Sequence, residues 1–560
     1  MSANEPWVDG LTIGEMLAAT ARRNPAGEAV VFPQFQYRRT FAELDADVDQ
    51  VARALMALGL QRGEHVAVWG TNWPQWLLLQ FATARMGAVL VTINPAYRSH
   101  ELAYVLKQSD TVALFLVDKF RNSDYFGMLG ETVPEVCQCG PEGWHCPAFP
   151  KLRQVVSFTD HPTLTGVNGW QAFLERASQV EETELREREG TLTPADPINI
   201  QYTSGTTGFP KGATLTHRNL LMNAYHVGDA QKLTESDRVC VPVPFYHCFG
   251  CVLGILCCAV HGAAMVVPHE YFRATETLVA LEQERATAVY GVPTMFIAML
   301  DDPTRAKRDL SSLRTGIMAG SPCPIEIMQR VVKELGAREV TIAYGLTEAS
   351  PVITQTRTDD SLELRVKTVG RPLPGWEVKL VDPVSGQAAE EGRQGELCAR
   401  GHGVMLGYYN MPDQTAEAID TEGWLHSGDL ATRLPSGYYR ITGRMKEMVI
   451  RGGENIYPRE IEEFLFTNPA IQNVAVVGVP DPKYIEELAA WIQLKPGSTL
   501  TEDEVRLFCK GQLAHYKIPR YIHFVTEFPQ TVTGKIQKFK MREVMIETHG
   551  LKTAAAMETA

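Results

Sequence analysis

The chain has 560 residues, of which 45% are hydrophobic and 21% are charged, and its formal net charge is −13. This length exceeds what one hydrophobic core supports, so we expect more than one packed unit. The negative charge disfavours unassisted binding to nucleic acid or to an anionic membrane, because both require a basic face. The eleven cysteines are odd in number and several lie in an apolar stretch, which argues against a disulfide framework.

Through most of the chain, short strand-like runs alternate with longer amphipathic runs. Near the start, EHVAVWG (Glu64–Gly70) predicts a strand, PQWLLLQFATARMG predicts the helix that follows, and AVLVTINP predicts the next strand. The runs TVALFLVD, RVCVPVP and ATAVYGVP repeat the pattern further along. Strands that alternate with helices form crossover units in parallel sheets. We therefore predict an α/β fold in which residues 1–443 form a large N-terminal domain of mixed, largely parallel sheets flanked by helices.

The most apolar stretch is CVLGILCCAVHGAAMVV, Cys251–Val267. It is shorter than a typical membrane span and contains His261 and two glycines, so it predicts a buried helix that runs into a strand. The first residues, MSANEPWVDG, lack the basic region and apolar core of a signal peptide. We therefore expect no integral membrane segment and a reducing, cytoplasmic location.

Beyond residue 446, the runs NVAVVGVPD, LAAWIQLK and YIHFVTEF predict strands interleaved with charged helices. They suffice for a small α+β domain at residues 447–547. We predict a boundary at residues 444–446 and a frayed tail at residues 548–560.

The stretch YTSGTTGFPKG, Tyr202–Gly212, combines hydroxyl side chains, glycines and Lys211. It is not a P-loop, because, counted from Gly205, Pro210 stands where that motif has its second glycine and Gly212 stands where it has Ser or Thr. An apolar strand that runs into such a turn directs backbone N–H groups and hydroxyls at one point, and Lys211 adds a full charge. The alternative is a mobile turn with an exposed lysine. We favour a phosphate-binding loop.

YTSGTTGFPKG also resembles the signature loop of the adenylate-forming superfamily of acyl-CoA synthetases, adenylation domains and luciferases. Six further blocks follow in that family's order and extend the resemblance over nearly the whole chain. They are PFYHCFG (Pro244–Gly250), YGLTEAS (Tyr344–Ser350), GELCARG (Gly395–Gly401), GWLHSGDL (Gly423–Leu430), YRITGRMKEMVIRGGENIYPREIE (Tyr439–Glu462) and TVTGKIQK (Thr531–Lys538). Through NPAYRSHELAYVLK, DPINIQYTSGTTG and HYKIPRYIHFVTEFPQTVTGKIQKFK, the chain also resembles medium-chain acyl-CoA synthetases of family member 2 and bacterial fatty acid–CoA ligases.

The resemblance implies a reaction in two halves. A carboxylate attacks the α-phosphorus of ATP and pyrophosphate leaves; the thiol of CoA then displaces AMP and forms a thioester. ATP, Mg²⁺ and CoA are therefore the implied cofactors, and a carboxylic acid, most simply a medium-chain fatty acid, is the implied substrate. The residues implied to bind ATP are Thr203, Ser204, Gly205, Thr206, Thr207, Gly208, Lys211, Tyr344, Asp429, Arg444 and Lys535.

Individual roles follow from the same resemblance. Thr347 resembles the hydroxyl donor to the α-phosphate, and Glu348 resembles the Mg²⁺ carboxylate, which suits a hard cation beside phosphates. Tyr344 resembles the ring that stacks on adenine, although a tyrosine beside a glycine is on its own more often a core residue. Asp429 and Arg444 resemble the ribose contacts.

The small domain is implied to be mobile, with Lys446 at its hinge. Lys535 resembles the lysine that bridges the acyl carboxylate and the α-phosphate, whereas a lysine in a polar loop is otherwise solvated surface. After rotation, Arg451, Gly452 and Gly453 are implied to meet CoA, because glycines let a thin pantetheine arm approach the backbone. A plain turn between a strand and a helix remains the alternative for these glycines.

His247 resembles a residue that gates the acyl channel, and a satisfied core histidine is an equal alternative. The candidate walls of the acyl pocket are apolar, which favours a hydrophobic tail over a polar amino acid. They are Tyr246, Phe249, Val292, Met295, Met318 and Gly320.

Two features depart from the family pattern. In GVPDPKYIEE, Ile485 stands where the family often has glycine, which puts the CoA contact in doubt. In CQCGPEGWHC, Cys137, Cys139, His145 and Cys146 could supply a tetrahedral Cys₃His zinc site. Their spacing is cramped and no second half of a zinc finger follows, so a loop insertion is our default interpretation.

Three other functions remain open on this sequence. One is a ligase that loads an acyl or aryl adenylate onto a carrier protein, and another is an oxygenase of the luciferase type. A third is a catalytically inactive acyl or nucleotide sensor, which would not need Lys211, Glu348, Asp429, Arg444 and Lys535 together. Small molecules are the expected partners, and the sequence leaves a homodimer open.

Overall fold

The computed structural model describes residues 6–141, 145–203, 210–321, 323, 325–383, 385–451, 454–510, 512–531 and 534–551. The chain folds into two compact units, each of which uses two separate parts of the sequence. Unit 1 comprises Met1–Glu377 and Ala399–Leu425, and unit 2 comprises Val378–Cys398 and His426–Ala560. This division differs from the predicted boundary at residues 444–446, which concerned a hinge and stays a prediction.

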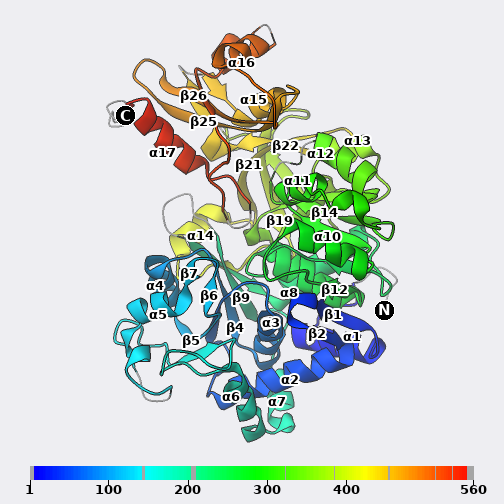
Figure 1. Ribbon diagram of the computed structural model, residues 1–560, viewed down its shortest axis with the longest axis vertical. Coiled ribbons are helices and arrows are strands. Elements are labelled where there is room, and N and C mark those ends of the chain that lie inside the picture. Colours follow the sequence, from blue (N-terminus) through cyan, green and yellow to red (C-terminus); the bar gives the residue numbers. More distant parts are fainter. Residues whose placement is uncertain are drawn as a thin grey trace. The chain divides into compact units, whose positions relative to one another are not determined.

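Two large sheets with parallel centres form the framework of unit 1 (Figure 1). The first sheet is antiparallel at both edges, and the second is antiparallel at one edge only. The first has the strand order β17 (Arg371–Pro372), β16 (Val352–Gln355), β15 (Glu339–Gly345), β14 (Thr315–Ala319), β13 (Ala288–Gly291), β11 (Arg238–Cys240), β12 (Ala264–Val266), β1 (Glu28–Phe32) and β2 (Tyr37–Thr40). The second has the order β20 (Gly407–Tyr408), β10 (Lys211–Thr216), β9 (Pro197–Thr203), β4 (Val89–Ile93), β3 (His65–Trp69), β5 (Thr111–Leu116) and β8 (Gln154–Ser157). A small hairpin, β6 (Lys119–Phe120) and β7 (Ser123–Asp124), stands apart.

The parallel strands are buried on both faces, which explains their continuous apolar sequence. Every residue of β3, β4 and β5 is buried, as expected for parallel strands covered by helices on both sides. The helices of unit 1 are α1 (Ile13–Arg23), α2 (Phe41–Ala57), α3 (Pro74–Met86), α4 (Ser99–Gln108), α5 (Tyr125–Thr132), α6 (Trp170–Glu175), α7 (Glu182–Glu189), α8 (His217–Ala230), α9 (Cys257–His261), α10 (Ala274–Gln283), α11 (Pro293–Asp301), α12 (Ile325–Arg330), α13 (Leu362–Lys367) and α14 (Pro412–Ala418). The predicted α/β class with largely parallel sheets is confirmed.

The apolar stretch Cys251–Val267 contains the expected helix and strand. A π-helical segment, Phe249–Leu256, continues into α9, and β12 follows after a left-handed glycine, Gly262. Within the described ranges, every helix is too short or too polar to cross the hydrocarbon core of a bilayer.

Unit 2 is built on two smaller sheets. A four-stranded sheet, most of which belongs to this unit, has the order β18 (Trp376–Val381), β19 (Gly395–Gly401), β21 (Leu425–Arg433) and β22 (Tyr439–Arg444). A five-stranded sheet has the order β24 (Glu454–Ile456), β23 (Val449–Arg451), β26 (Ile485–Leu494) and β25 (Ile471–Asp481), and β27 (Tyr521–Phe524) also pairs with β26. Its helices are α15 (Pro458–Leu465), α16 (Glu502–Cys509) and α17 (Lys538–Thr548).

Alternation along β25 decides which helix covers which face of the five-stranded sheet. Val474 and Val476 belong to an apolar cluster with residues of α15 and α16. Ala475 and Val477 belong to a second cluster with Met541 and other residues of α17. Successive side chains of a strand point to opposite faces, so the run NVAVV supplies both faces of a sheet that helices cover on both sides (Figure 1).

A buried arginine joins the helices that cover one part of unit 1. The guanidinium of Arg85, on α3, is fully buried and forms ion pairs with Asp45 and Asp49 of α2. Its Nε lies 3.5 Å from Glu189 of α7. A buried charge that loses its partners is costly, so this cluster fixes the packing of α2, α3 and α7 in one arrangement.

We predict that Arg85→Ala lowers the free energy of unfolding by about 3–5 kcal/mol, because it leaves Asp45 and Asp49 without their buried partner. Arg62→Ala is the matched control. Arg62 forms an ion pair of 2.6 Å with Asp196, but its side chain is 45% exposed, so the loss should be about 1 kcal/mol or less. Urea unfolding of both variants measures the difference, and equal losses would contradict the structural role given to Arg85.

Candidate active site

The two ends of the predicted phosphate loop lie side by side in unit 1. Thr203 is the last residue of β9 and Lys211 the first of β10, and the two residues are partners across this antiparallel pair. The loop between them therefore starts and ends at one edge of a rigid hairpin. The predicted loop residues Ser204, Gly205, Thr206, Thr207 and Gly208 lie outside the described residues.

Tyr408, which the sequence analysis did not single out, connects this hairpin to the proposed magnesium carboxylate. Tyr408 lies in β20, where it pairs with Ala213 of β10. Its hydroxyl donates a 2.7 Å hydrogen bond to Oε1 of Glu348. The Nζ atom of Lys211 lies 5.0 Å from the centre of the Tyr408 ring, within the range of a cation–π contact. Burial and the negative charge of Glu348 raise the pKa of Tyr408 well above its ordinary value, so its hydroxyl remains a donor at neutral pH.

The block YGLTEAS crosses from the end of β15 into a single 3-10 turn, Thr347–Ala349. Tyr344 is half-buried near the end of the strand, and Thr347 and Glu348 begin the turn. The carbonyl of Glu348 accepts a hydrogen bond of 2.9 Å from the N–H of Met405. This backbone contact and the Tyr408 hydrogen bond fix Glu348 at both its main chain and its side chain.

The block PFYHCFG lies against the same turn. The Sγ atom of Cys248 is 3.7 Å from Oγ1 of Thr347 and 3.7 Å from Nδ1 of His247. Nδ1 of His247 also accepts a 3.0 Å hydrogen bond from the N–H of Phe249, which fixes the orientation of the half-buried ring. Burial raises the pKa of the Cys248 thiol to about 12, so this thiol is neutral and not a nucleophile. Such a fixed ring suits both the gating and the core interpretation of His247.

The candidate acyl-pocket residues differ in their surroundings. Tyr246, Phe249, Val292 and Met295 are buried with small remaining exposures, whereas Met318 is fully buried within an apolar core cluster. Gly320 is exposed and has a φ of +86°, and a Cβ on it would lie 3.1 Å from Val292. Val292 and Gly320 are thus neighbours, and Met318 acts as a core residue. The acyl pocket itself stays a prediction.

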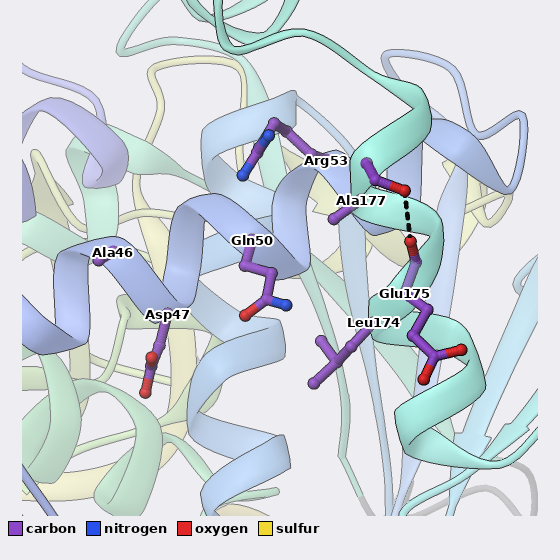
Figure 2. Close-up of a pocket in the computed structure, with 8 residues that line it drawn as sticks. Ala46, Asp47, Gln50, Arg53, Leu174, Glu175 and Ala177 are labelled. Atoms are coloured by element: carbon purple, nitrogen blue, oxygen red, sulfur yellow. Dashed lines mark hydrogen bonds between the residues drawn. The ribbon is translucent and has the colours of Figure 1, made fainter.

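A surface cavity of about 540 Å³ lies elsewhere in unit 1, between α2 and the α6 region (Figure 2). Its polar lining includes Asp47, Gln50 and Arg53, and the hydroxyl of Ser178 donates to the carbonyl of Glu175 at 2.9 Å. None of the predicted site residues lines this cavity, so we assign it no part in the chemistry.

In unit 2, the two predicted ribose contacts form an ion pair. Asp429 and Arg444 are partners across β21 and β22, and Nε of Arg444 lies 2.7 Å from Oδ1 of Asp429. The Asp429 side chain is 5% exposed and that of Arg444 is 43% exposed. The strand pairing therefore places the two residues side by side, and their contact with ribose stays a prediction.

Lys535 lies exposed in a tight turn on the same unit. Its N–H donates to Oγ1 of Thr531 at 3.1 Å, and its carbonyl accepts the N–H of Thr531 at 2.8 Å. Burial opposes ionisation of Glu447, but the charges of Lys538, Arg444 and Lys535 outweigh it and hold the pKa of Glu447 below its ordinary value. Lys535 and Arg444 therefore act electrostatically on one carboxylate.

Lys538 is a second residue that the sequence analysis missed. Its Nζ lies 2.8 Å from Glu447, next to the predicted hinge Lys446, and 2.8 Å from Glu462 of α15. Burial lowers the pKa of Lys538, but the two carboxylates outweigh this effect and raise it. This three-residue contact holds the turn that carries Lys535 against the short 3-10 helix Met445–Glu447.

The segment predicted to meet CoA has a strained neighbour. Arg451 forms a 2.6 Å ion pair with Glu487 and lies 4.3 Å from the centre of the Tyr484 ring. It also pairs with Ile485 across β23 and β26. Ile485 has a φ of +71° and is 55% exposed, so a β-branched residue occupies the left-handed region that favours glycine. Gly452 and Gly453 lie outside the described residues.

The possible zinc ligands near residue 140 do not converge. Among the described residues, three or more metal-binding atoms lie within 4.8 Å of one another only at Glu396, Cys398 and His426. Cys137, Cys139, His145 and Cys146 therefore form no such group, and the interpretation as a loop insertion stays a prediction.

Comparisons with known proteins show the family to which the chain is similar. Residues 17–409 match the model of the AMP-binding enzyme family, and residues 460–535 match that of the AMP-binding enzyme C-terminal domain. The chain is 50% identical over 543 residues to "Putative acyl-CoA synthetase YngI" of Bacillus subtilis (strain 168), with 97% of this chain and 98% of that protein covered. It is 43% identical to the mitochondrial medium-chain acyl-CoA ligase ACSF2 of Bos taurus, over 95% of this chain and 87% of that protein. The crystal structure of the anthranilate CoA ligase AuaEII with anthranoyl-AMP superimposes with a TM-score of 0.81 at 26% identity, over 96% of this chain and 97% of that one.

We predict that Tyr408→Phe slows ATP–pyrophosphate exchange by about tenfold. A hydrogen bond to a charged group contributes about 1.5–3 kcal/mol, and about 1.4 kcal/mol corresponds to a factor of ten in rate. Tyr409→Phe is the control, because the Tyr409 hydroxyl donates instead to Asp110 at 2.9 Å. Exchange rates that fall equally in both variants would rule out a specific link between Tyr408 and Glu348.

We also predict that Ile485→Gly raises the free energy of unfolding of unit 2 by about 1 kcal/mol. Relief of the left-handed strain, about 1–2 kcal/mol, exceeds the entropic cost of a glycine. Ile450→Gly is the control, because Ile450 is similarly exposed at 42% but has no positive φ. It should instead destabilise the protein by about 1 kcal/mol. Denaturant midpoints that shift in the same direction for both variants would contradict the assignment of strain to Ile485.

Proposed function

Because the chain belongs to the AMP-binding enzyme family, we propose that it is an ATP-dependent acyl-CoA synthetase that acts on medium-chain fatty acids. The family match spans most of the chain, and the named relatives are acyl-CoA synthetases or ligases. Medium chain length rests on the activity for which the Bos taurus relative is named and on the apolar candidate pocket. The single observation that carries the proposal is the pair of contacts that Tyr408 makes. Its ring lies 5.0 Å from Nζ of Lys211, at the start of β10, and its hydroxyl donates to Glu348.

In the first half-reaction, a carboxylate oxygen of the fatty acid forms a bond to the α-phosphorus of ATP, and the bond from that phosphorus to the bridging oxygen of pyrophosphate breaks. Such a transfer depends on positioning and on charge stabilisation. We assign Thr203, Lys211 and the intervening loop to the β- and γ-phosphates, and Thr347 to the α-phosphate. Tyr344 would stack on adenine, and Asp429 with Arg444 would bind the ribose.

Glu348 is the residue that would hold Mg²⁺. Its carboxylate is a hard oxygen donor beside the proposed phosphate site, and Tyr408 occupies only one of its two oxygens. Mg²⁺ commonly takes one or two carboxylates together with substrate phosphates, so this donor set fits the ion. When bound, the ion would neutralise charge on the departing pyrophosphate.

In the second half-reaction, the sulfur of CoA forms a bond to the acyl carbon, the bond to AMP breaks, and the thiol proton passes to solvent. We assign Arg451, Gly452 and Gly453 to CoA and Lys446 to the hinge between the two catalytic arrangements. Lys535 would serve the first half-reaction only. The eleven cysteines, all within the described residues, form no disulfide, which fits the reducing cytoplasm that we propose as the location.

We predict that Lys535→Ala reduces acyl-adenylate formation by about 10²–10³, because a preorganised charge at the reacting phosphate is lost. The conversion of supplied octanoyl-AMP and CoA to octanoyl-CoA should stay within about twofold. Lys540→Ala, which removes an exposed lysine of α17, is the matched control and should leave both half-reactions intact. If both half-reactions fall equally in Lys535→Ala, the proposed division of labour is wrong.

A further inference from the structure

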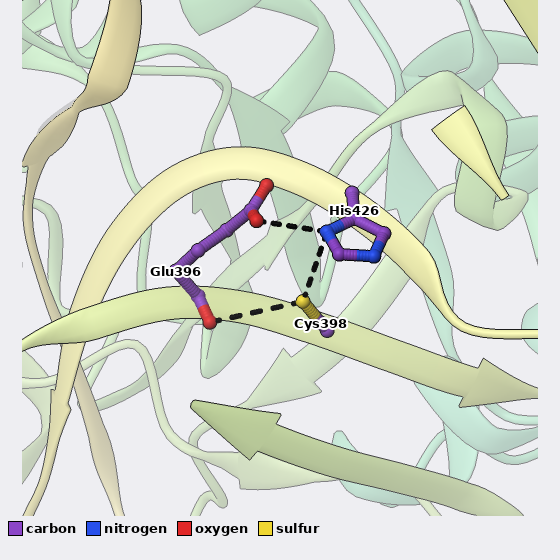
Figure 3. A group of neighbouring side chains, drawn as sticks. All are labelled: Glu396, Cys398 and His426. Atoms are coloured by element: carbon purple, nitrogen blue, oxygen red, sulfur yellow. Dashed lines mark hydrogen bonds and ion pairs between the residues drawn. The ribbon is translucent and has the colours of Figure 1, made fainter. Parts of the chain in front are cut away.

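Glu396, Cys398 and His426 form a compact cluster in unit 2 that the proposed reaction does not use (Figure 3). Glu396 and Cys398 lie on β19, and His426 lies on the neighbouring strand β21. Figure 3 shows the carboxylate, the thiol and the imidazole turned toward one another. Nδ1 of His426 is 2.8 Å from Oε2 of Glu396 and 3.4 Å from Sγ of Cys398.

We propose that these three side chains bind a divalent transition metal ion of borderline softness, with zinc as the simplest occupant. Thiolate, imidazole and carboxylate are the ligand types that zinc takes, whereas magnesium and calcium prefer oxygen ligands alone. Three protein ligands leave a fourth position to solvent. The His426 side chain is 31% exposed, so water can reach the cluster from that side.

The two separations that involve His426 need only a small adjustment. Bond lengths of about 2.0–2.3 Å at a tetrahedral centre separate nitrogen and oxygen ligands by about 3.3 Å, and nitrogen and sulfur ligands by about 3.6 Å. The present separations of 2.8 and 3.4 Å are therefore short by about half an ångström or less. Rotation of the half-exposed imidazole supplies this movement, and binding releases the thiol proton of Cys398 to solvent.

The second oxygen of Glu396 makes the cluster relevant to the nucleotide site. Oε1 of Glu396 accepts the N–H of Gly428 at 3.0 Å, while Oε2 faces His426. A metal ion bound through Oε2 would leave the hydrogen bond from Gly428 to Oε1 in place. Gly428 directly precedes Asp429 in the chain. The metal would thus tie β19 to β21 beside the Asp429–Arg444 pair and stabilise unit 2.

This inference does not depend on the proposed reaction, because binding is measured without substrate. The purified chain is freed of metal with a chelator and titrated with Co²⁺, which reports a thiolate ligand through a charge-transfer absorption band. We expect one Co²⁺ per chain with this band, its displacement by one equivalent of Zn²⁺, and a rise in Tm when Zn²⁺ is present. No band, and no effect of Zn²⁺ on Tm in the unaltered chain, would overturn the proposal.

Variants assign the signal to this cluster. Cys398→Ser should abolish the charge-transfer band, and His426→Gln should weaken Co²⁺ binding by at least about tenfold, because zinc-type sites lose much of their affinity with one ligand. His426→Gln also provides an independent result if Cys398→Ser fails to fold. The matched control is the double variant Cys137→Ser/Cys139→Ser, which removes the other cysteine group and should bind Co²⁺ as the unaltered chain does. A band that is lost in this control and kept in Cys398→Ser would overturn the proposal.

Discussion

The antiparallel hairpin of β9 and β10 is the constraint on which the site in unit 1 depends. β9 ends at Thr203 where β10 begins at Lys211, so these two residues lie side by side at the two ends of the predicted phosphate loop. β20 extends the hairpin by one strand and brings Tyr408, about two hundred residues later in the chain, next to Lys211. The hydrogen bond from Tyr408 then fixes Glu348. One tyrosine thus connects Lys211, through its ring, with Glu348, through its hydroxyl.

In unit 2, ion pairs of Lys538 hold the segment that carries Lys535. The exposed catalytic candidate, Lys535, lies on a turn that would be free to move if only local hydrogen bonds held it. The contact of Lys538 with Glu447 and Glu462 connects the start of α17 to the region of the predicted hinge and to α15. In the Lys538–Glu447 pair, the lysine side chain is 22% exposed and the glutamate side chain is 35% exposed. The pair is partly shielded from water, so it contributes more to stability than a fully exposed ion pair does. It does not carry the full desolvation cost of a buried charge.

The sequence predicted the class of fold and many elements because those depend on local periodicity. EHVAVWG and AVLVTINP became β3 and β4, and the apolar stretch after His247 became a helix and then a strand, as expected. The period-two pattern of NVAVV even determines the two faces of the sheet in unit 2. Asp429 and Arg444, predicted to act together, are cross-strand partners. Family resemblance supplied their roles, which periodicity alone could not.

Other features depend on tertiary pairing and left no local signal. Tyr408 and Lys538 look like ordinary polar or aromatic residues in the sequence, and only the pairing of β20 and the docking of α17 give them partners. The same holds for Glu396, Cys398 and His426, which come from two blocks that the sequence analysis treated separately. Sequence reasoning instead considered the cysteines near residue 140, because closeness along the chain is visible there. Those four residues form no compact group of three ligand atoms, whereas two adjacent strands bring a thiol, an imidazole and a carboxylate together. Cross-strand neighbours are therefore the better place to look for new sites in a sheet-based protein.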